Sequence, residues 1–311
     1  MPWSFRYIMA CAPMITDFVF WFREQVRRCG IRNIWFSARD GYLLQKLYRM
    51  LEKEADTVYF LTSRMAAVRA GVMDDADIAY VDSMKFGGTL EENLKARFGL
   101  EADGTKSGLL SYKDSILEHA ATERRRYWAY ISSLDVQEGD IAFFDFVAKG
   151  TTQMYVQRLV GHHLKGFYFL QLEPDFMEGK GLDIEPFYKR EEAESSSIYE
   201  NYYVLETILT APHPCVCGFD DVGNPVYAKE CRKKADIECF LRVQEGIQDY
   251  FQRYLELLPS GFGNTGSMTK ELDEVILGLI ANLKIEDDGF MSLVVEDSFF
   301  NRMTGMAELI R

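Results

Sequence analysis

Apolar residues follow a helical period at the start of the chain and then give way to short apolar runs. Between Ile8 and Cys29 they recur at the three- and four-residue spacing of one helix face, and Cys29-Gly30 is typical of a helix end. Later runs are short and almost entirely apolar, which is typical of buried strands. They lie at 34–36, 58–62, 141–144 and 164–172.

Each of the first three runs ends in a small, polar turn that opens a helical pattern. These turns are SARDG (37–41), SR (63–64) and AKGTT (148–152). Strands that are apolar throughout and alternate with helices predict an α/β fold, in which helices flank a parallel sheet. Ligands in such sheets bind beyond the carboxyl ends of the strands, so we expect the three turns to meet there.

The helical pattern extends beyond the strands and their crossover helices. Residues 72–135 combine helical periodicity with many charges, which predicts a helical insertion that caps the sheet. A Gly-, Pro- and Glu-rich stretch follows the fourth strand to about residue 197, and a helix is expected from there through Ala211. We therefore expect a core at 1–210 that contains the insertion.

The last third of the chain begins with a different pattern. The sequence CVCGFDDVGNPVYA predicts a hairpin with its turn at 222–224. Residues 232–310 are predicted to be mostly helical, with a break at 259–267. We expect 211–311 to form a hairpin and helical C-terminal region that packs on the core.

Composition narrows the classes of partner. The chain has 311 residues, 48% of them hydrophobic and 14% aromatic, so it can bury a large core. Its formal net charge of -13 argues against nucleic acid or an anionic membrane surface as a partner, because both would repel it. An anionic ligand would need a local cluster of donors.

Targeting and metal signals are weak. The six cysteines form no CxxC pair and accompany only four histidines, so no zinc site is predicted and the thiols are expected to be reduced. The apolar run at 9–22 is too short to span a bilayer, contains Asp17 and lacks signal-peptide features. We expect a cytoplasmic protein without a transmembrane segment.

The turn after the third strand has the composition of a phosphate site. A loop that opens a helix presents unpaired amides and the positive end of the helix dipole. Lys149 adds charge, Gly150 allows close approach, and Thr151 and Thr152 add hydroxyl donors. Asp145, at the strand end, is placed to accept hydrogen bonds from sugar hydroxyls. The alternative is a structural turn of similar composition.

The segment IAFF-DF-VA-KGTT resembles the phosphoribosyl pyrophosphate (PRPP) loop of the type I phosphoribosyltransferases. In that family four hydrophobic residues precede two acids, two apolar residues and a Thr-Gly-rich turn. Two positions differ here, because Phe146 replaces the second acid and Lys149 replaces the usual threonine. The resemblance implies that Asp145 binds ribose and that 149–152 bind the 5-phosphate. It also implies Mg²⁺, with Asp145 as its contact on the protein.

The resemblance extends to the two earlier turns. It implies that the first turn, with Ser63 and Arg64 of the second, holds the pyrophosphate, and that Asp40 acts as general base or on the metal side. In the first turn, the residues that the resemblance implies for pyrophosphate binding are Ser37, Ala38, Arg39 and Gly41. The alternatives are that Arg39 and Asp40 pair with each other or with helix ends, and that Arg64 is a surface residue that caps its neighbour's carbonyls. His162 and His163 are expected to be ordinary helix-end residues, and His213 has no predicted role.

Most of the chain is also similar to a module of bacterial capsule and O-antigen gene clusters, often fused to haloacid-dehalogenase-type phosphatases or glycosyltransferases. The segments that carry this similarity are FRYIMACAPMITDFVFWFRE, IWFSARDGYLLQKLY, VYFLTSRMAA, IAFFDFVAKGTTQ with LKGFYF, and CVCGF. The usual DIGWSG-type turn is DFVAKG here. The resemblance implies transfer of 5-phosphoribose from PRPP to a glycan hydroxyl, on an acceptor that is free or lipid-linked. A separate phosphatase would then remove the 5-phosphate.

The sequence also bears on other functions. A haloacid-dehalogenase phosphatase needs a second acid two residues after its nucleophile, whereas Val147 occupies that position after Asp145. No GxGxxG follows any strand, which argues against a dinucleotide enzyme. A non-catalytic scaffold of a polysaccharide assembly complex is the alternative that Phe146 favours. For the transferase, we expect the acceptor under the insertion or beside the Cys215 hairpin.

Overall fold

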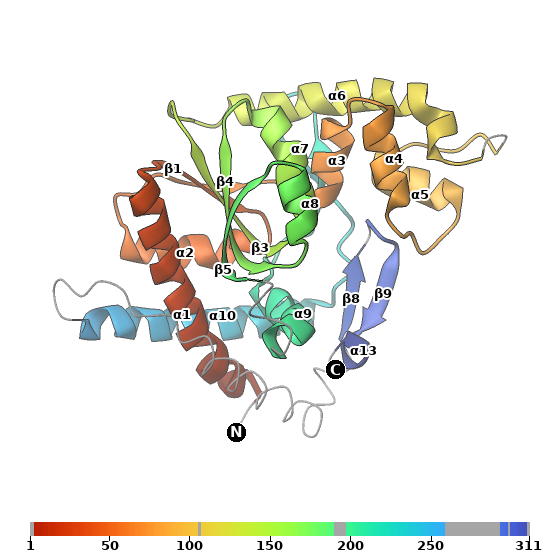
Figure 1. Cartoon of the computed structure of the whole chain (residues 1–311). Coiled ribbons are helices and arrows are strands. Elements are labelled where there is room, and N and C mark those ends of the chain that lie inside the picture. The colour runs from red at the N-terminus through yellow and green to blue at the C-terminus, as the bar shows by residue number, and fades with distance from the viewer. Residues whose placement is uncertain (1–2, 105–106, 190–196, 259–292, 298, 310–311) are drawn as a thin grey trace.

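A five-stranded, all-parallel sheet forms the centre of the protein, in a computed structural model that describes residues 3–104, 107–189, 197–258, 293–297 and 299–309 (Figure 1). The strands lie in the order β2-β1-β3-β4-β5, which confirms the predicted α/β fold. The order changes direction between β1 and β3, and this switch point is where ligands bind in such sheets. Their bounds are β1 Asn33–Ser37, β2 Thr57–Phe60, β3 Ile141–Ala148, β4 Leu164–Gln171 and β5 Asp183–Tyr188.

Helices pack on both faces of the sheet, and strand β3 shows why its sequence is apolar throughout. Phe144 and Phe146 face one core, whereas Ile141 and Phe143 face the other. Alternate residues of a strand point to opposite faces, so a strand covered on both sides needs apolar residues at every position. The first core is completed by α1 (Trp3–Cys29), α2 (Gly41–Leu51), α9 (Ser197–Leu209) and α10 (Lys234–Leu257), and the second by α3 (Arg64–Gly71), α6 (Lys113–Ser132) and α7 (Thr151–Val160).

The insertion at 72–135 is helical, as predicted. It contains α4 (Asp75–Ser83), α5 (Leu90–Phe98), the 3-10 helix η1 (Leu109–Tyr112) and α6. The fully buried Arg97 joins this insertion to the C-terminal end of the chain, because its guanidinium donates to the backbone carbonyls of both. The acceptors are Val81 at 2.6 Å, Met84 at 3.2 Å, Lys85 at 3.0 Å and Phe299 at 3.1 Å.

Two segments differ from the sequence predictions. The Gly-, Pro- and Glu-rich stretch after β4 contains helix α8 (Pro174–Gly179) and strand β5. Pro186 lies within β5, which is tolerated because β5 is an edge strand. The prediction that 232–310 is mostly helical is wrong at its end: after α10, strands β8 (Val294–Asp297) and β9 (Arg302–Gly305) form a hairpin before α13 (Met306–Leu309). The predicted break at 259–267 lies outside the described residues.

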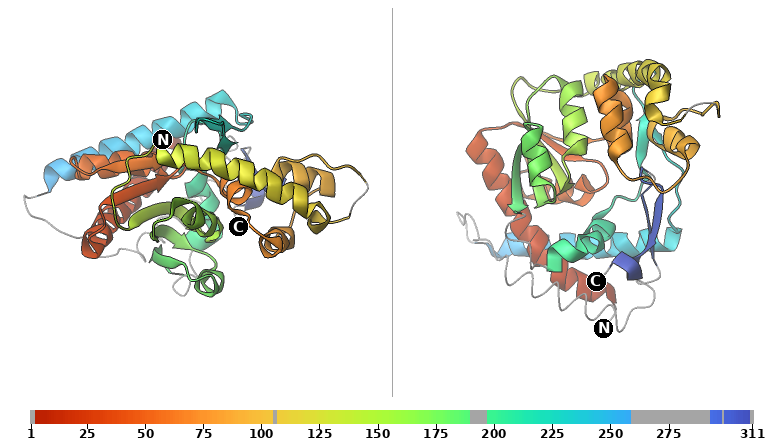
Figure 2. Two further views of the ribbon diagram at one scale, coloured as in Figure 1. Left: turned by 90° about the horizontal axis from the view of Figure 1, so that it is seen from above. Right: turned by 45° about the vertical axis from the view of Figure 1, so that its right-hand side comes forward.

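The C-terminal region packs against the core through α10 on one face of the sheet and through β6 (Val216–Phe219) on the other. Phe240, Val243 and Ile247 of α10 belong to the same hydrophobic core as Phe144 of β3. The predicted hairpin is present as β6 and β7 (Pro225–Tyr227). Figure 2 shows the β8–β9 hairpin (blue) reaching toward the helical insertion (orange). The division at residue 210 stays a prediction, since residues on both sides of it share one core.

Two further sequence expectations concern the whole chain. All six cysteines are free, and each lies in the described residues. Among the helices that the structure describes, none combines the length and the apolar character that a bilayer crossing requires.

Candidate functional site

A cavity of about 260 Å³ lies at the carboxyl ends of β1 and β3, next to the switch point. All the predicted site residues except Gly41 line it, so the three predicted turns meet in one place. Those residues are Ser37, Ala38, Arg39, Asp40, Ser63, Arg64, Asp145, Lys149, Gly150, Thr151 and Thr152.

Gly41 has a packing role instead of a place in the cavity wall. It is the first residue of α2, and a Cβ atom added to it would lie 2.7 Å from Cβ of Phe36 in β1. Glycine therefore allows the start of α2 to pack directly on the strand. The prediction that Gly41 contacts pyrophosphate holds at most for its backbone amide, at the amino end of the helix.

The turn after β1 is held in shape by its own backbone. Arg39 has φ of 74°, in the left-handed region that non-glycine residues rarely adopt. Its amide donates to the Tyr59 hydroxyl at 2.9 Å, and the Ala38 amide donates to the Phe60 carbonyl at 2.8 Å. These two amides are therefore used within the protein and are not free to bind a phosphate.

The Arg39 side chain is also engaged. Its Nε and Nη2 atoms each lie 3.1 Å from Oγ1 of Thr210, which follows α9. Within the described residues, no ion pair joins Arg39 to Asp40, so the alternative of a pair between these two residues is wrong. Thr210 thus turns the guanidinium toward the C-terminal region, at one wall of the cavity.

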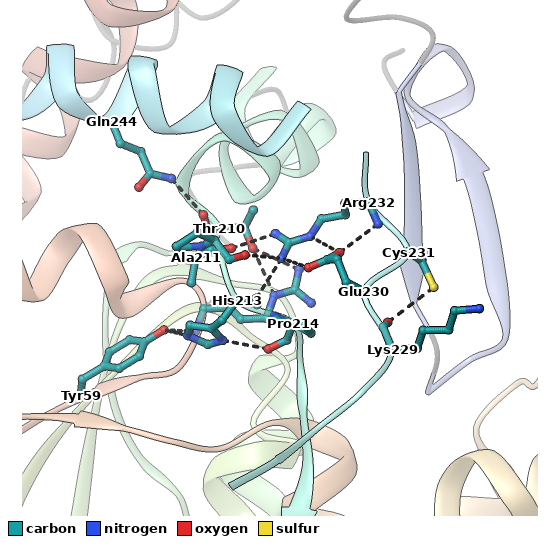
Figure 3. A network of polar contacts seen from close by, with 12 residues as sticks. Tyr59, Thr210, Ala211, His213, Pro214, Lys229, Glu230, Cys231, Arg232 and Gln244 are labelled. Carbon is teal, nitrogen blue, oxygen red and sulfur yellow. Dashed lines mark hydrogen bonds and ion pairs between the residues drawn. The ribbon is translucent and has the colours of Figure 1, made fainter. Parts of the chain in front are cut away.

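A hydrogen-bonded chain gives His213 a role that the sequence did not indicate. Nδ1 of His213 lies 2.8 Å from the Pro214 carbonyl, so it carries the proton, and Nε2 accepts from the Tyr59 hydroxyl at 2.7 Å (Figure 3). Tyr59 in turn accepts from the Arg39 amide. Burial lowers the pKa of His213, which favours the neutral ring that this chain requires. His213 therefore supports the turn after β1.

In the second turn, the Ser63 side chain is hydrogen-bonded within the protein, whereas Arg64 faces the cavity. The Ser63 hydroxyl caps α3 by accepting from the Ala66 amide at 3.0 Å, and it donates to the Val216 carbonyl at 2.5 Å. It is thus a structural cap and not a free phosphate donor. Arg64 points into the cavity, where Nη1 lies 3.6 Å from Oδ2 of Asp297 and the guanidinium lies 5.0 Å from the centre of the Phe300 ring.

The third turn keeps its donors available. Gly150 has φ of 78°, and a Cβ atom there would lie 2.9 Å from Cδ1 of Leu182, so this position needs glycine. Within the described part of the chain, Lys149 makes no ion pair, and burial lowers its pKa. The Thr151 hydroxyl lies 3.3 Å from the Tyr80 hydroxyl. The Thr152 side chain makes no hydrogen bond within the described residues.

Three carboxylates face the cavity and disfavour each other's ionised forms. Burial raises the pKa of Asp145 to about 7, although the carboxylate accepts from the Phe146 amide at 2.9 Å and lies 3.4 Å from the Ser37 hydroxyl. The pKa of Asp40 lies well above its ordinary value because of burial, and then because of Glu206 and Asp145. Burial also raises the pKa of Glu206. All three residues are half-buried and line the cavity.

Sequence reasoning missed the wall that comes from the C-terminal half. Glu206 lies on α9 and lines the cavity. In the sequence it is marked only by its place one helical turn after two tyrosines. Within the described residues, its side chain makes no hydrogen bond or ion pair. The other lining residues that were not predicted are Met65, Val147, Tyr202, Tyr203, Thr207, Cys215, Val295, Asp297, Phe299, Phe300 and Arg302.

The chain offers Mg²⁺ a contact and not a complete site. No group of three His, Cys, Asp or Glu side chains in the described residues is arranged to hold a metal ion. Mg²⁺ commonly takes one or two carboxylates together with substrate phosphates and waters. Oδ1 of Asp145 is used by the Phe146 amide, which leaves Oδ2 for such a contact. The residues thus fit an ion that arrives with a diphosphate.

Comparison with known proteins adds no family assignment. No protein-family model matches this chain, and no curated protein is significantly similar to it.

Proposed function

We propose that this protein is a phosphoribosyltransferase that moves 5-phosphoribose from PRPP to a glycan hydroxyl and releases pyrophosphate. One observation carries the proposal: three turns, each opening a helix and each from a different strand, line a single cavity at the switch point of the sheet. A ligand with phosphates at both ends of a sugar needs two separated groups of donors, and the turns after β1 and β2 would provide one and the turn after β3 the other.

On this proposal, the hydrogen bonds within the protein favour a narrower set of ligand contacts than the sequence did. The 5-phosphate is assigned to Lys149 and to the first amides of α7 at Gly150, Thr151 and Thr152, because these donors are free. The ribose hydroxyls are assigned to the Asp145 carboxylate. Pyrophosphate is assigned to Arg64 and to the amino end of α2, since the hydroxyl of Ser63 and the amides of Ala38 and Arg39 are already bonded.

The chain's own groups then perform three tasks in the reaction. They hold the sugar so that its anomeric carbon is exposed, they stabilise the charge that develops on departing pyrophosphate, and they accept the proton of the acceptor hydroxyl. Asp40 is the proposed proton acceptor, because its raised pKa brings it closer to the working range of a general base. Bound Mg²⁺ would supply further charge stabilisation on the diphosphate.

The scaffold without turnover remains the alternative, and one observation bears on it. Phe146, which replaces the second acid of the loop motif, is fully buried and stacks on Phe169 with ring centres 4.6 Å apart. It therefore points into the core and not into the cavity. The cavity still contains the carboxylates of Asp40, Asp145 and Glu206, so the replacement does not remove acid groups from it.

Binding of PRPP is the first test. We expect PRPP with Mg²⁺ to raise the Tm of the full chain, and we expect Arg64→Ala and Lys149→Ala each to weaken this binding at least tenfold by isothermal titration. Lys53→Ala, on an exposed loop outside the cavity, is the control and should bind as the wild type does. Unchanged affinity in both cavity variants would refute the site assignment.

Turnover separates the transferase from the scaffold. We expect pyrophosphate release from PRPP to increase when a glycoside acceptor is added, with formation of a phosphoribosyl glycoside detected by mass spectrometry. Tight PRPP binding without pyrophosphate release, with every acceptor tried, would favour the scaffold instead.

A further inference from the structure

A second cavity, of about 170 Å³, adjoins the first. The two share Arg39, Thr207, Cys215 and Val295 in their walls, so they meet at the junction between the sheet edge and the C-terminal region. The rest of the second cavity is lined by the loop after α9, by the residues from Ala228 to Lys233, by Asp236 and Phe240 of α10, and by Leu293 and Val294. Its volume is below the range of about 300–1,000 Å³ that drug-sized ligands occupy, so it suits a single ring.

Hydrogen bonds of Arg232 and Gln244 hold one wall of the second cavity in place. Arg232 donates to the carbonyls of Ala211 at 2.8 Å and His213 at 2.9 Å, and its Nη2 lies 2.7 Å from Oε2 of Glu230 (Figure 3). Gln244 donates to the Thr210 carbonyl at 2.9 Å. These bonds hold the loop after α9 against α10 and against the segment that precedes this helix, and Glu230 neutralises the charge of Arg232.

The chemistry of the walls favours a sugar over a phosphate or a lipid. Phe240, Leu293 and Val295 form an apolar side, whereas the rim carries Lys229 and Asp236, which make no ion pair within the described residues. A pyranose ring matches this mixture, because it has C–H groups on its faces and hydroxyls at its edge. Lys229 and Lys233 would offer charge to a phosphate, but Glu230 engages Arg232 and the carboxylate of Asp236 would repel the anion. A lipid chain would leave the polar rim unpaired.

We propose that the second cavity binds the pyranose ring of the acceptor and directs one hydroxyl past Thr207 into the first cavity. This inference rests on the proposed function. The acceptor oxygen would bond to the anomeric carbon as the bond to pyrophosphate breaks, and its proton would pass to a carboxylate of the first cavity. PRPP and the acceptor supply every atom of the step, so no further reactant is needed.

Saturation-transfer NMR on the full chain tests the sugar site without turnover. The probes are p-nitrophenyl pyranosides of glucose, galactose, mannose and N-acetylglucosamine. We expect at least one to give a signal with the wild type and with Ala235→Trp, an exposed control. Ala228→Trp, which fills the cavity, should reduce that signal at least tenfold. Asp236→Asn, a smaller change that serves if the tryptophan variant does not fold, should reduce it severalfold.

The outcomes decide between the two proposals. A signal that survives both Ala228→Trp and Asp236→Asn, or no signal from any probe with the wild type, would overturn the sugar site. The variants should keep the Tm increase that PRPP causes, because both residues lie outside the first cavity. If PRPP fails to bind the wild type while Ala228→Trp abolishes glycoside binding, the transferase proposal fails and the sugar site stands.

Discussion

Replacing Asp145 with asparagine should stabilise the ligand-free protein, and more so at high pH. Burial raises the pKa of Asp145 to about 7 in the folded chain, whereas an unfolded aspartate titrates near 4. A raised pKa means that folding favours the protonated acid. The stability that it contributes is therefore complete below about pH 4 and is lost as the pH rises to about 7.

The pKa of Asp145 differs by roughly three between the folded and the unfolded chain. This difference corresponds to a change of at most about 4 kcal/mol in the free energy of unfolding between low and high pH. Asp145 keeps part of its surface open to the cavity, so water reduces this value. Between pH 5 and pH 8 we expect the free energy of unfolding of the wild type to fall by ~1–2 kcal/mol relative to Asp145→Asn. Asparagine can still accept from the amide of Phe146, so the local hydrogen bond is kept.

Urea denaturation at pH 5, 6, 7 and 8 measures this difference, with Asp249→Asn on the exposed face of α10 as the matched control. The control should differ from the wild type by a constant amount across the series. A constant difference for Asp145→Asn as well would show that its carboxylate ionises as freely as an exposed one, and the reasoning about the cavity would be refuted. The same variant should bind PRPP less tightly, since it loses a charged acceptor for the ribose hydroxyls.

Three other changes test the supports of the cavity. Gly150→Ala should cost about 2–3 kcal/mol in urea denaturation, against about 1 kcal/mol for Gly161→Ala, because both have positive φ but only the former meets a close neighbour; equal costs would contradict this. Arg97→Met should cost about 3–5 kcal/mol, as buried carbonyls lose their donor, and a cost under about 1 kcal/mol would contradict it. Tyr59→Phe should cost about 1 kcal/mol and shift the Nε2 resonance of His213 in ¹⁵N NMR, because Nε2 loses its donor while Nδ1–H keeps the Pro214 carbonyl; an unchanged Nε2 resonance would disprove the chain.

The core of the fold was predictable because its signals are local. Each of the first four strands is an apolar run, and the polar turns after β1, β2 and β3 each open a helical pattern. Strand β5 was missed because Pro186 interrupts it, and only its edge position makes that residue acceptable. Strands β8 and β9 are four residues each and are paired only with each other, so their sequence carries little periodicity.

The site was predictable on one side only. Residues that follow strands can be located from the sheet rule, and those after β1, β2 and β3 do line one cavity. Which donors are free could not be read from the sequence, because the Arg39 guanidinium donates to Thr210 and the Ser63 hydroxyl donates to Val216, each more than a hundred residues away. Glu206 and Asp297 enter from elements whose approach to the sheet depends on tertiary packing, so no local pattern marks them.

The charges around the cavity set a condition on any polyanionic ligand. Its wall carries four basic residues, Arg39, Arg64, Lys149 and Arg302, and four acidic ones, Asp40, Asp145, Glu206 and Asp297. Arg64 lies near Asp297 and Arg39 is held by Thr210, so the formal balance gives a diphosphate no net attraction, and the chain's charge of -13 opposes its approach. The raised pKa values of Asp40, Asp145 and Glu206 change this balance, because protons taken up there remove negative charge. Binding of a diphosphate should therefore be linked either to proton uptake or to a divalent cation that the ligand brings with it.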